Sequence, residues 1–200
     1  KYFALCGDSD YVIYSTFKFN NSGFGHAVDL VWGQDNDYAV LNDHNTIQIF
    51  KNFVEDKSYK TTFKNHGIFG GKLIGVSTKQ GGSSVSFFDW GTFTCIRRID
   101  VETPKNIYWS ASGEYVVICL EDCFYVLRYN ESVVKKYLQT KGATSIGEEG
   151  IEEAFTFLSD FNEEVVRGEW VSGDAFVFTT AKGKLNYLRG EKVINHALDD

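Results

Sequence analysis

The residues of this sequence that could do chemistry are four cysteines, four histidines and several pairs of acidic residues. The cysteines are Cys6, Cys95, Cys119 and Cys123, and no two of them form a CxxC pair. A zinc site needs Cys and His clustered at short spacings. The histidines are His26, His44, His66 and His196, far from such a pattern. We therefore predict reduced, buried thiols in the strands of a cytosolic protein.

The same residue types do not form a nucleophilic or acid–base site in the sequence. The histidines are spread one per region, so no Ser-His-Asp or Cys-His group is indicated. The acidic pairs at 148–149, 152–153 and 163–164 are typical of solvated surface, because catalytic acids would have to be brought together by the fold. The stretch 67–73 lacks the Gly-Lys-Ser/Thr ending of a phosphate loop. We predict a protein that is not an enzyme, with no catalytic, cofactor-binding or metal-binding residue, and the ligand-binding residues stay unassigned.

Composition narrows the partners. The 200 residues include 20 basic and 27 acidic side chains, a net charge of -7, and the basic pairs at 97–98 and 135–136 are isolated. Since phosphate-backbone binding needs clustered Lys and Arg, nucleic acid is not an expected partner. No apolar run approaches the roughly 20 residues that cross a bilayer, so any membrane association should be peripheral. The chain contains no Met, even at position 1, and we expect it to be an internal piece of a longer protein.

Short strands are the elements that must position any site. Runs of β-branched and aromatic residues recur between Gly, Asn, Asp and Ser, which are turn formers. Examples are residues 11–14, 38–41, 47–50, 85–88 and 115–118. The pattern predicts antiparallel strands.

These strands repeat. Similar six-residue runs begin at Ile47, Val85, Phe124 and Leu185, separated by steps of 38, 39 and 61 residues. A second column contains Trp32, Gly70, Trp109 and Trp170, and its outer steps of 77 and 61 residues match the first column. Cys6 followed by residues 10–13 resembles a shortened copy of the same unit. Two columns with the same offsets indicate a true repeat.

A period near 39 residues without helical periodicity is typical of β-propeller blades. We therefore predict an all-β, WD40-like β-propeller over residues 1–200, as a partial ring of about four to five blades. In such a fold each sheet buries both faces against its neighbours. The three repeated tryptophans are then expected to pack between blades rather than to stack on a ligand.

The longest step holds about 22 extra residues, between Asn130 and Glu164. Two groups have helical spacing: Val133, Val134, Tyr137 and Leu138, with Asn130 as N-cap, and then Ile151, Ala154, Phe155 and Leu158. We predict a short helical insertion at about 131–163. It is either a binding element on the propeller rim or a cover over an exposed sheet edge, and the sequence leaves both open.

The ordered motifs of the chain carry a specific resemblance. They are residues 49–53, 87–90, 96–99, 107–110, 112–114, 149–155 and 185–187. In this order the chain resembles the second WD-repeat β-propeller of the coatomer beta-prime subunit family, part of the COPI vesicle coat. The alpha subunit of the same coat is the nearest family with a related architecture.

The resemblance implies a non-catalytic structural and protein-interaction domain of the COPI coatomer, acting in Golgi-to-ER retrograde and intra-Golgi vesicle transport. It implies the alpha and epsilon coatomer subunits as partners, an Arf-family GTPase through the assembled coat, and dilysine cargo tails through the other propeller. The expected location is cytoplasmic, and peripheral on Golgi membranes and COPI vesicles. Flanking blades and an α-solenoid are expected outside the chain.

Two other functions stay open at this point. One is a propeller adaptor that binds a peptide, recognising sorting signals or ubiquitin. The other, less favoured, is a propeller enzyme with acids gathered at the central channel. Because one fold supports many functions, the resemblance and not the repeat supports the coat role.

Overall fold

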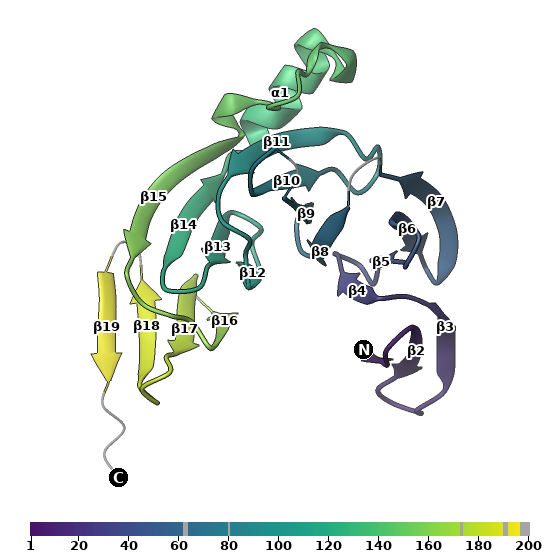
Figure 1. The fold of residues 1–200 in the computed structure, drawn as a ribbon, viewed down its shortest axis with the longest axis horizontal. Helices are drawn as coiled ribbons and strands as arrows, with labels where there is room; N and C mark the ends of the chain where they lie inside the picture. The colour runs from purple at the N-terminus through teal and green to yellow at the C-terminus, as the bar shows by residue number, and fades with distance from the viewer. Residues whose placement is uncertain (62–63, 80, 173, 190–191, 197–200) are drawn as a thin grey trace. The chain divides into compact units, whose positions relative to one another are not determined.

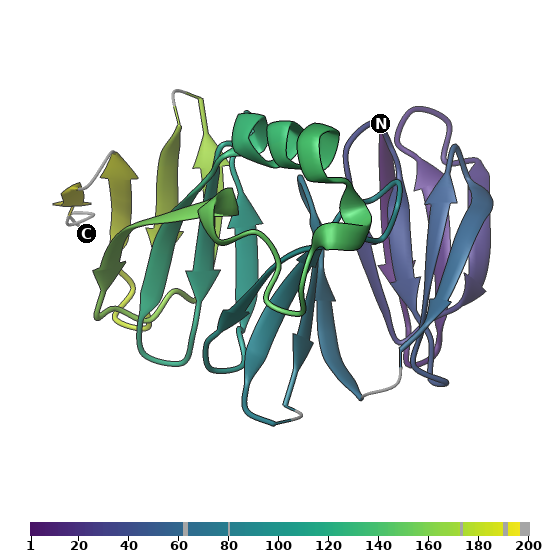
Figure 2. The same cartoon turned by 90° about the horizontal axis from the view of Figure 1, so that it is seen from above.

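The computed structural model describes residues 1–61, 64–79, 81–172, 174–189 and 192–196, the last range by its backbone (Figure 1). The chain divides into two compact units, Lys1–Phe93 and Thr94–Asp200. Both units are built mainly from antiparallel strands, as Figure 2 also shows, which confirms the all-β prediction. Among the described residues, no helix is long and apolar enough to span a bilayer.

The first unit holds strands β1 to β10. Their sheets run in the orders β1-β2-β3, β4-β5-β6-β7 and, for the third, β8-β9-β10 within this unit. The bounds are β1 Tyr2–Cys6, β2 Asp10–Ser15, β3 Asn21–His26, β4 Asp29–Trp32, β5 Tyr38–Leu41, β6 Thr46–Lys51, β7 Val54–Lys60, β8 Asn65–Phe69, β9 Ile74–Thr78 and β10 Ser84–Phe88.

The second unit begins with β11 and continues with two sheets, β12-β13-β14-β15 and β16-β17-β18-β19. The strand bounds are β11 Cys95–Asp100, β12 Asn106–Trp109, β13 Tyr115–Cys119, β14 Phe124–Tyr129, β15 Phe155–Phe161, β16 Arg167–Val171, β17 Ala175–Thr179, β18 Leu185–Arg189 and β19 Lys192–His196. The helix α1 spans Glu131–Lys141, and two 3-10 turns span Ala143–Ser145 and Glu152–Ala154.

The first repeat column is confirmed as one structural position. The four runs form β6, β10, β14 and β18, which are the third strands in chain order of their sheets. Alternation explains why they are strands: in β6 the side chains of Ile47 and Ile49 are fully buried, while Gln48 between them is half-buried. The period of two places one row of side chains on each face of the sheet.

The tryptophan column is confirmed by strand register. Trp32 pairs with Tyr38, which pairs with Phe50 on the next strand. In the last sheet Trp170 pairs with Phe176, which pairs with Leu188. In the sheet between β12 and β15, the third set is Trp109, Val116 and Leu127. The same three-strand row therefore recurs, and residues can be matched between sheets by counting from it.

The first sheet corrects one part of the repeat assignment. The β2–β3 pair has a register shift after Ile13, as β6–β7 has after Ile49 and β14–β15 after Val126. Because this bulge marks the third and fourth strands elsewhere, β2 matches a third strand and not, as the sequence alignment of Cys6 implied, a second one. The described part of this sheet therefore lacks the first strand of the repeat.

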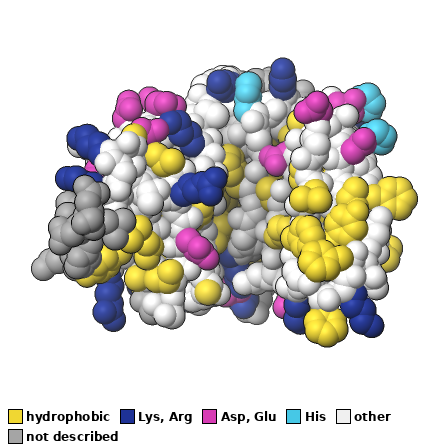
Figure 3. Space-filling model, turned by 90° about the horizontal axis from the view of Figure 1, so that it is seen from below, with side chains coloured by type: hydrophobic (Ala, Val, Ile, Leu, Met, Phe, Trp, Pro, Cys, Tyr) yellow, Lys and Arg dark blue, Asp and Glu magenta, His cyan; other side chains and the backbone are white. Residues whose placement is uncertain are grey.

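One face of the first sheet is apolar and exposed. Leu5 is 59% exposed and Phe24 is 76% exposed. Phe3 and Tyr14 stack on each other at a ring distance of 5.8 Å. Figure 3 shows hydrophobic side chains gathered over this end of the first unit. Such an area is unusual for a finished surface.

Successive sheets bury their facing side chains. In the first unit Trp32 packs with Tyr11, Ile13 and Tyr38, which come from the first two sheets. A Cβ atom at Gly70 would lie 2.1 Å from the carbonyl oxygen of Trp32, so only glycine allows the third sheet to approach this closely. The column position is thus a packing position even where the tryptophan is missing.

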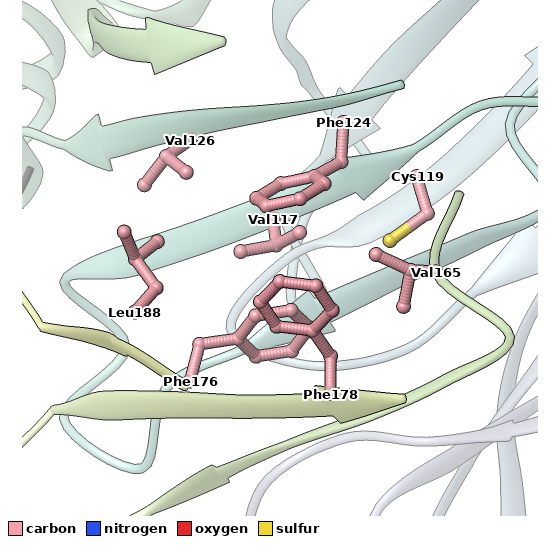
Figure 4. Close-up of a cluster of buried hydrophobic side chains, with 8 residues drawn as sticks. All are labelled: Val117, Cys119, Phe124, Val126, Val165, Phe176, Phe178 and Leu188. Atoms are coloured by element: carbon pink, nitrogen blue, oxygen red, sulfur yellow. The ribbon is translucent and has the colours of Figure 1, made fainter. Parts of the chain in front are cut away.

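The second unit shows the same packing. Phe176 and Phe178 of β17 point toward Val117 and Phe124 of the preceding sheet (Figure 4). The Trp170 indole nitrogen donates a hydrogen bond to the carbonyl oxygen of Tyr108 at 2.9 Å. Packing between sheets is therefore confirmed for Trp32 and Trp170. Trp109 contacts the rings of Tyr129 and Phe155 on its own sheet.

The insertion is helical only in its first half. The helix α1 begins after Asn130, as predicted, but the Asn130 side chain does not cap it. Its amide nitrogen instead donates to the carbonyl oxygen of Glu153 at 2.8 Å and to the hydroxyl of Thr156 at 2.9 Å. Along the predicted helical face Val134 is buried, whereas Val133 is 38% exposed.

The second predicted helix is wrong. Only residues 152–154 form a 3-10 turn, and Phe155–Phe161 is the strand β15. The bulge explains the misleading spacing, because Phe157 pairs with Leu127 and Ser159 with Val126, which leaves Leu158 unpaired between them. One extra residue in a strand shifts later side chains to the other face, so the apolar spacing imitates a helix.

The end of the insertion covers a strand edge. Gly150 forms a bridge with Arg97 of β11, and the Ile151 amide donates to the carbonyl oxygen of Ile96 at 2.7 Å. The Arg98 amide donates to the carbonyl oxygen of Glu149 at 3.0 Å. Of the two roles that the sequence left open, these contacts support the edge cover for residues 149–151.

The thiol prediction is correct for one cysteine and wrong for another. All four thiols are free, and Cys119 is buried, whereas Cys95 and Cys123 are half-buried. Burial, followed by the nearby Cys123 thiol, raises the pKa of Cys119 to about 12. Cys6 is exposed, because it lies at the end of β1, where the first sheet has no inner strand to cover it.

Candidate interaction sites

Each unit contains a groove at the rim of its sheets. The first groove has a volume of about 590 Å³ and is lined by residues 9, 11, 24–28, 42–44, 48, 50 and 55. The second groove has a volume of about 310 Å³ and is lined by residues 162–164, 180–182, 184 and 186. The sequence predicted no site residue at all, so both grooves are findings of the structure.

The two grooves occupy the same place in the repeat. Each lies between the connection that leads into a sheet, the turn between its second and third strands, and its third strand. In the first groove that strand contributes Gln48, which pairs with Val40 on β5, two residues from the Tyr38–Phe50 pair. In the second it contributes Asn186, which pairs with Phe178, two residues from the Phe176–Leu188 pair. Gln48 and Asn186 are therefore matched positions.

Polar and aromatic groups line the first groove. The Gln48 amide nitrogen donates to a carboxylate oxygen of Glu55 at 3.2 Å. Below them, the Tyr38 hydroxyl hydrogen-bonds to Tyr11, and burial raises the pKa of both phenols. Phe24 is 76% exposed at the edge. The groove thus offers an aromatic surface beside a carboxylate.

Two histidines that are 18 positions apart both line the first groove. His26 Nδ1 lies 2.7 Å from an Asp10 carboxylate oxygen, and His44 Nδ1 lies 3.6 Å from that of Asp43. The sequence missed this pair, because a sheet connection and a turn on the next sheet bring them together. Their side chains are 85% and 80% exposed, which is typical of surface ion pairs rather than of a buried catalytic pair.

The second groove has a different chemistry. Asn186 is only 1% exposed, and neither its amide nitrogen nor its oxygen has a hydrogen-bond partner among the described residues. On one wall Glu164 accepts a hydrogen bond from the Lys105 ammonium at 3.0 Å. Hydrogen bonds to Glu121 and Glu164 raise the pKa of Lys105. On the other wall Lys182 and Lys184 are exposed.

A polar signal for these positions was present in the sequence. In the four repeat runs the second column is polar throughout, with Gln48, Ser86, Tyr125 and Asn186. Depth could not be inferred from it, because exposure depends on the neighbouring sheet. The prediction that acidic pairs are solvated holds for 148–149 and 152–153, which are exposed, whereas Glu163 and Glu164 are half-buried in the second groove.

The other candidates from the sequence form no further site. The stretch 67–73 is the end of β8 and the following turn, where it serves sheet packing at Gly70. Within the described ranges, no group of three or more His, Cys, Asp or Glu is placed to hold a metal ion. The Arg97 guanidinium donates to the carbonyl oxygen of Glu149 at 3.1 Å and so belongs to the edge cover.

Comparison with known proteins agrees with the repeat and the register. Residues 1–199 match the family model described as the COPA/B second beta-propeller. The chain belongs to this family. The sheets described above are therefore part of a WD-repeat β-propeller, and the predicted fold class and family resemblance are confirmed.

Similar proteins are coatomer subunits. The chain is 41% identical to coatomer subunit beta'-2 of Oryza sativa subsp. japonica over 96% of its length and 20% of that protein. It is 39% identical to coatomer subunit beta' of Homo sapiens over 98% of its length and 21% of that protein. The chain thus spans about a fifth of the length of these relatives.

Solved structures with low identity share the fold. Hydrazine synthase of Kuenenia stuttgartiensis aligns with a TM-score of 0.59 and 13% identity, covering 96% of this chain and 61% of that one. Hsv2p of Kluyveromyces lactis aligns with a TM-score of 0.51 and 11% identity, covering 96% of this chain and 71% of that one. At this identity the likeness concerns the fold alone.

Proposed function

We propose that the chain is a non-catalytic structural and protein-interaction domain of the COPI coatomer, acting in Golgi-to-ER retrograde and intra-Golgi vesicle transport. The observation that carries the proposal is the family match over residues 1–199, together with beta' relatives at 39–41% identity. A set of stacked sheets with rigid, buried interfaces suits this work, because it presents its rim and loops at fixed positions.

The partners follow from the same proposal. The alpha and epsilon subunits are the expected neighbours, and an Arf-family GTPase acts through the assembled coat. Dilysine cargo tails are expected to bind the other propeller of the protein. The location is cytoplasmic, and peripheral on Golgi membranes and COPI vesicles.

We also propose that further sheets of the same protein complete this propeller and that an α-solenoid lies elsewhere in it. The exposed apolar face of the first sheet supports the first part, since Leu5 and Phe24 are 59% and 76% exposed on a sheet that lacks one strand. Another sheet of the repeat would bury these side chains, as the described sheets bury theirs.

The coat proposal is tested by assembly from purified components. The full protein should bind purified alpha and epsilon subunits in a stable complex, and a tagged form should localise to Golgi membranes in cells. A matched version with residues 1–200 replaced by an unrelated propeller measures the contribution of this domain. A full protein that binds neither subunit and is absent from Golgi membranes would contradict the proposal.

A second function is favoured by the grooves. A peptide-binding adaptor needs a concave site with a few polar groups, and the first groove offers Phe24 beside the carboxylates of Asp43 and Glu55. Basic sorting signals such as dilysine peptides, or ubiquitin, are the ligands to titrate. Saturable binding that is lost in Glu55→Gln would support this function, and the absence of saturable binding by either ligand would exclude it for this groove.

A further inference from the structure

The second groove contains a buried amide that the described chain does not satisfy. Asn186 is 1% exposed, and both polar atoms of its carboxamide lack a hydrogen-bond partner among the described residues. A buried amide without partners costs free energy, and most buried polar groups in folded proteins are paired. Its presence on the wall of a groove indicates that a bound group supplies the missing hydrogen bonds.

We propose that the second groove binds an extended acidic peptide segment, whose main chain pairs with the Asn186 carboxamide. The carboxamide oxygen accepts from a peptide N–H, and the amide nitrogen donates to a peptide carbonyl. The proposal rests on the protein-interaction role given above and adds a site and a ligand class to it.

The size of the groove fits a short segment. Its volume of about 310 Å³ lies at the lower end of the range for ligand sites in proteins. The same volume would hold roughly ten water molecules at about 30 Å³ each. A few residues of an extended peptide can therefore displace water there, whereas a folded domain could insert only a loop.

The charges of the walls select an acidic peptide. Lys182 and Lys184 lie on the turn between β17 and β18, are exposed, and make no ion pair with the described residues. On the opposite wall the ion pair with Lys105 compensates Glu164 at 3.0 Å. The turn itself is fixed, since the Gly183 amide donates to the carbonyl oxygen of Thr180 at 2.9 Å. Two unpaired ammonium groups beside the amide thus favour carboxylate side chains on the ligand.

The test is selection of a random dodecapeptide library against the immobilised full protein, followed by fluorescence anisotropy with the enriched peptides. The enriched sequences should be acidic. Asn186→Leu should weaken their binding at least tenfold, and Lys182→Glu combined with Lys184→Glu should do the same. The matched control is Gln48→Leu in the first groove, which should leave binding unchanged.

A second measurement separates the proposal from a structural role of Asn186. Leu has a similar size and no unsatisfied polar atom, so the melting temperature of Asn186→Leu should rise by about 2 °C or more when no peptide is present. A lower melting temperature would show that ordered water or the chain satisfies the amide, and it would overturn the proposal. Failure to enrich any peptide, enrichment of basic peptides, or equal binding to Asn186→Leu would overturn it too.

These outcomes differ from a failure of the coat proposal. Asn186→Leu should still bind purified alpha and epsilon subunits, because the groove is not assumed to hold them. Loss of peptide binding with subunit binding intact concerns the groove alone. Loss of subunit binding in the unaltered protein concerns the proposed function alone.

Discussion

The two grooves occupy the same place in the repeat and yet treat their amide side chains in opposite ways. In the first groove Gln48 is half-buried and donates to Glu55 on the outer strand β7 at 3.2 Å. In the second, Asn186 is 1% exposed and has no partner among the described residues. The repeat thus sets the backbone position of the amide, whereas the neighbouring strands decide whether it is satisfied.

A second difference lies where each sheet begins. Asp29 and Arg167 are matched positions, because they pair with Leu41 and Thr179 at the far end of the same three-strand row. Asp29 is half-buried and accepts a hydrogen bond from the Ile68 amide at 3.4 Å, whereas Arg167 is exposed. Repeats can therefore exchange a carboxylate for a guanidinium at this position, provided that its surroundings change as well.

The largest expected effect tests whether the packing below the grooves is equivalent. Phe176 is fully buried against Val117 and Phe124, as Tyr38 is against Tyr11 and Ile13 (Figure 4). Phe176→Ala should reduce the free energy of unfolding by about 3–5 kcal/mol, because it removes a large ring and leaves a cavity. Urea denaturation measures this change.

Tyr38→Ala is the matched variant in the first unit, and its loss should be of the same order. A loss below about 1 kcal/mol for either variant would show that the two positions are not equivalent.

The next effect concerns close approach in the second unit. A Cβ atom at Gly168 would lie 2.2 Å from the ring of Phe176. Gly168→Ala should therefore destabilise the protein by about 1–3 kcal/mol through overpacking. Thermal unfolding should show the change. The matched position in the first unit is already Leu30, and Leu30→Ala should leave no such clash; a Gly168→Ala variant as stable as the unaltered protein would contradict the packing described.

Asp29 should make the stability of the protein depend on pH. Burial raises the pKa of this carboxyl above its usual value of 3.8, although hydrogen bonds from Ile68 and Leu30 act against it. The folded state then holds the proton more tightly than the unfolded state, so stability falls as the pH rises above 3.8 through the raised pKa. Each unit of pKa elevation corresponds to about 1.4 kcal/mol.

Asp29→Asn removes the charge and keeps an acceptor for the Ile68 amide. The variant should be more stable than the unaltered protein at pH 7, and the difference should vanish near pH 3.8, where the carboxyl is protonated in both states. Urea denaturation at several pH values measures it, with Arg167→Gln as the matched control without this dependence. A difference that grows as the pH falls would be the wrong sign.

The sequence predicted what is local and repeated. The columns that begin at Ile47 and Trp32 follow from alternation and spacing, so the sheets and their packing positions could be predicted. The bulge at Leu158 could not, because one extra residue imitates helical spacing. The site could be predicted least: Asn186 shares a polar column with Gln48, but its depth is set by the preceding sheet, which is far away in sequence.

The smallest effect returns to the satisfied amide. Gln48 is half-buried and its partner Glu55 is exposed, so water can replace the carboxylate when it is removed. Glu55→Ala should therefore change the free energy of unfolding by less than about 0.5 kcal/mol, within the usual range for surface positions. The comparison with Asn186→Leu, whose melting temperature should rise, is then a matter of depth rather than of residue type. A loss above 1 kcal/mol in Glu55→Ala, measured by urea denaturation, would mean that water does not reach Gln48. The two grooves would then be alike in excluding water, and the difference between them would lie only in which amide has found a partner.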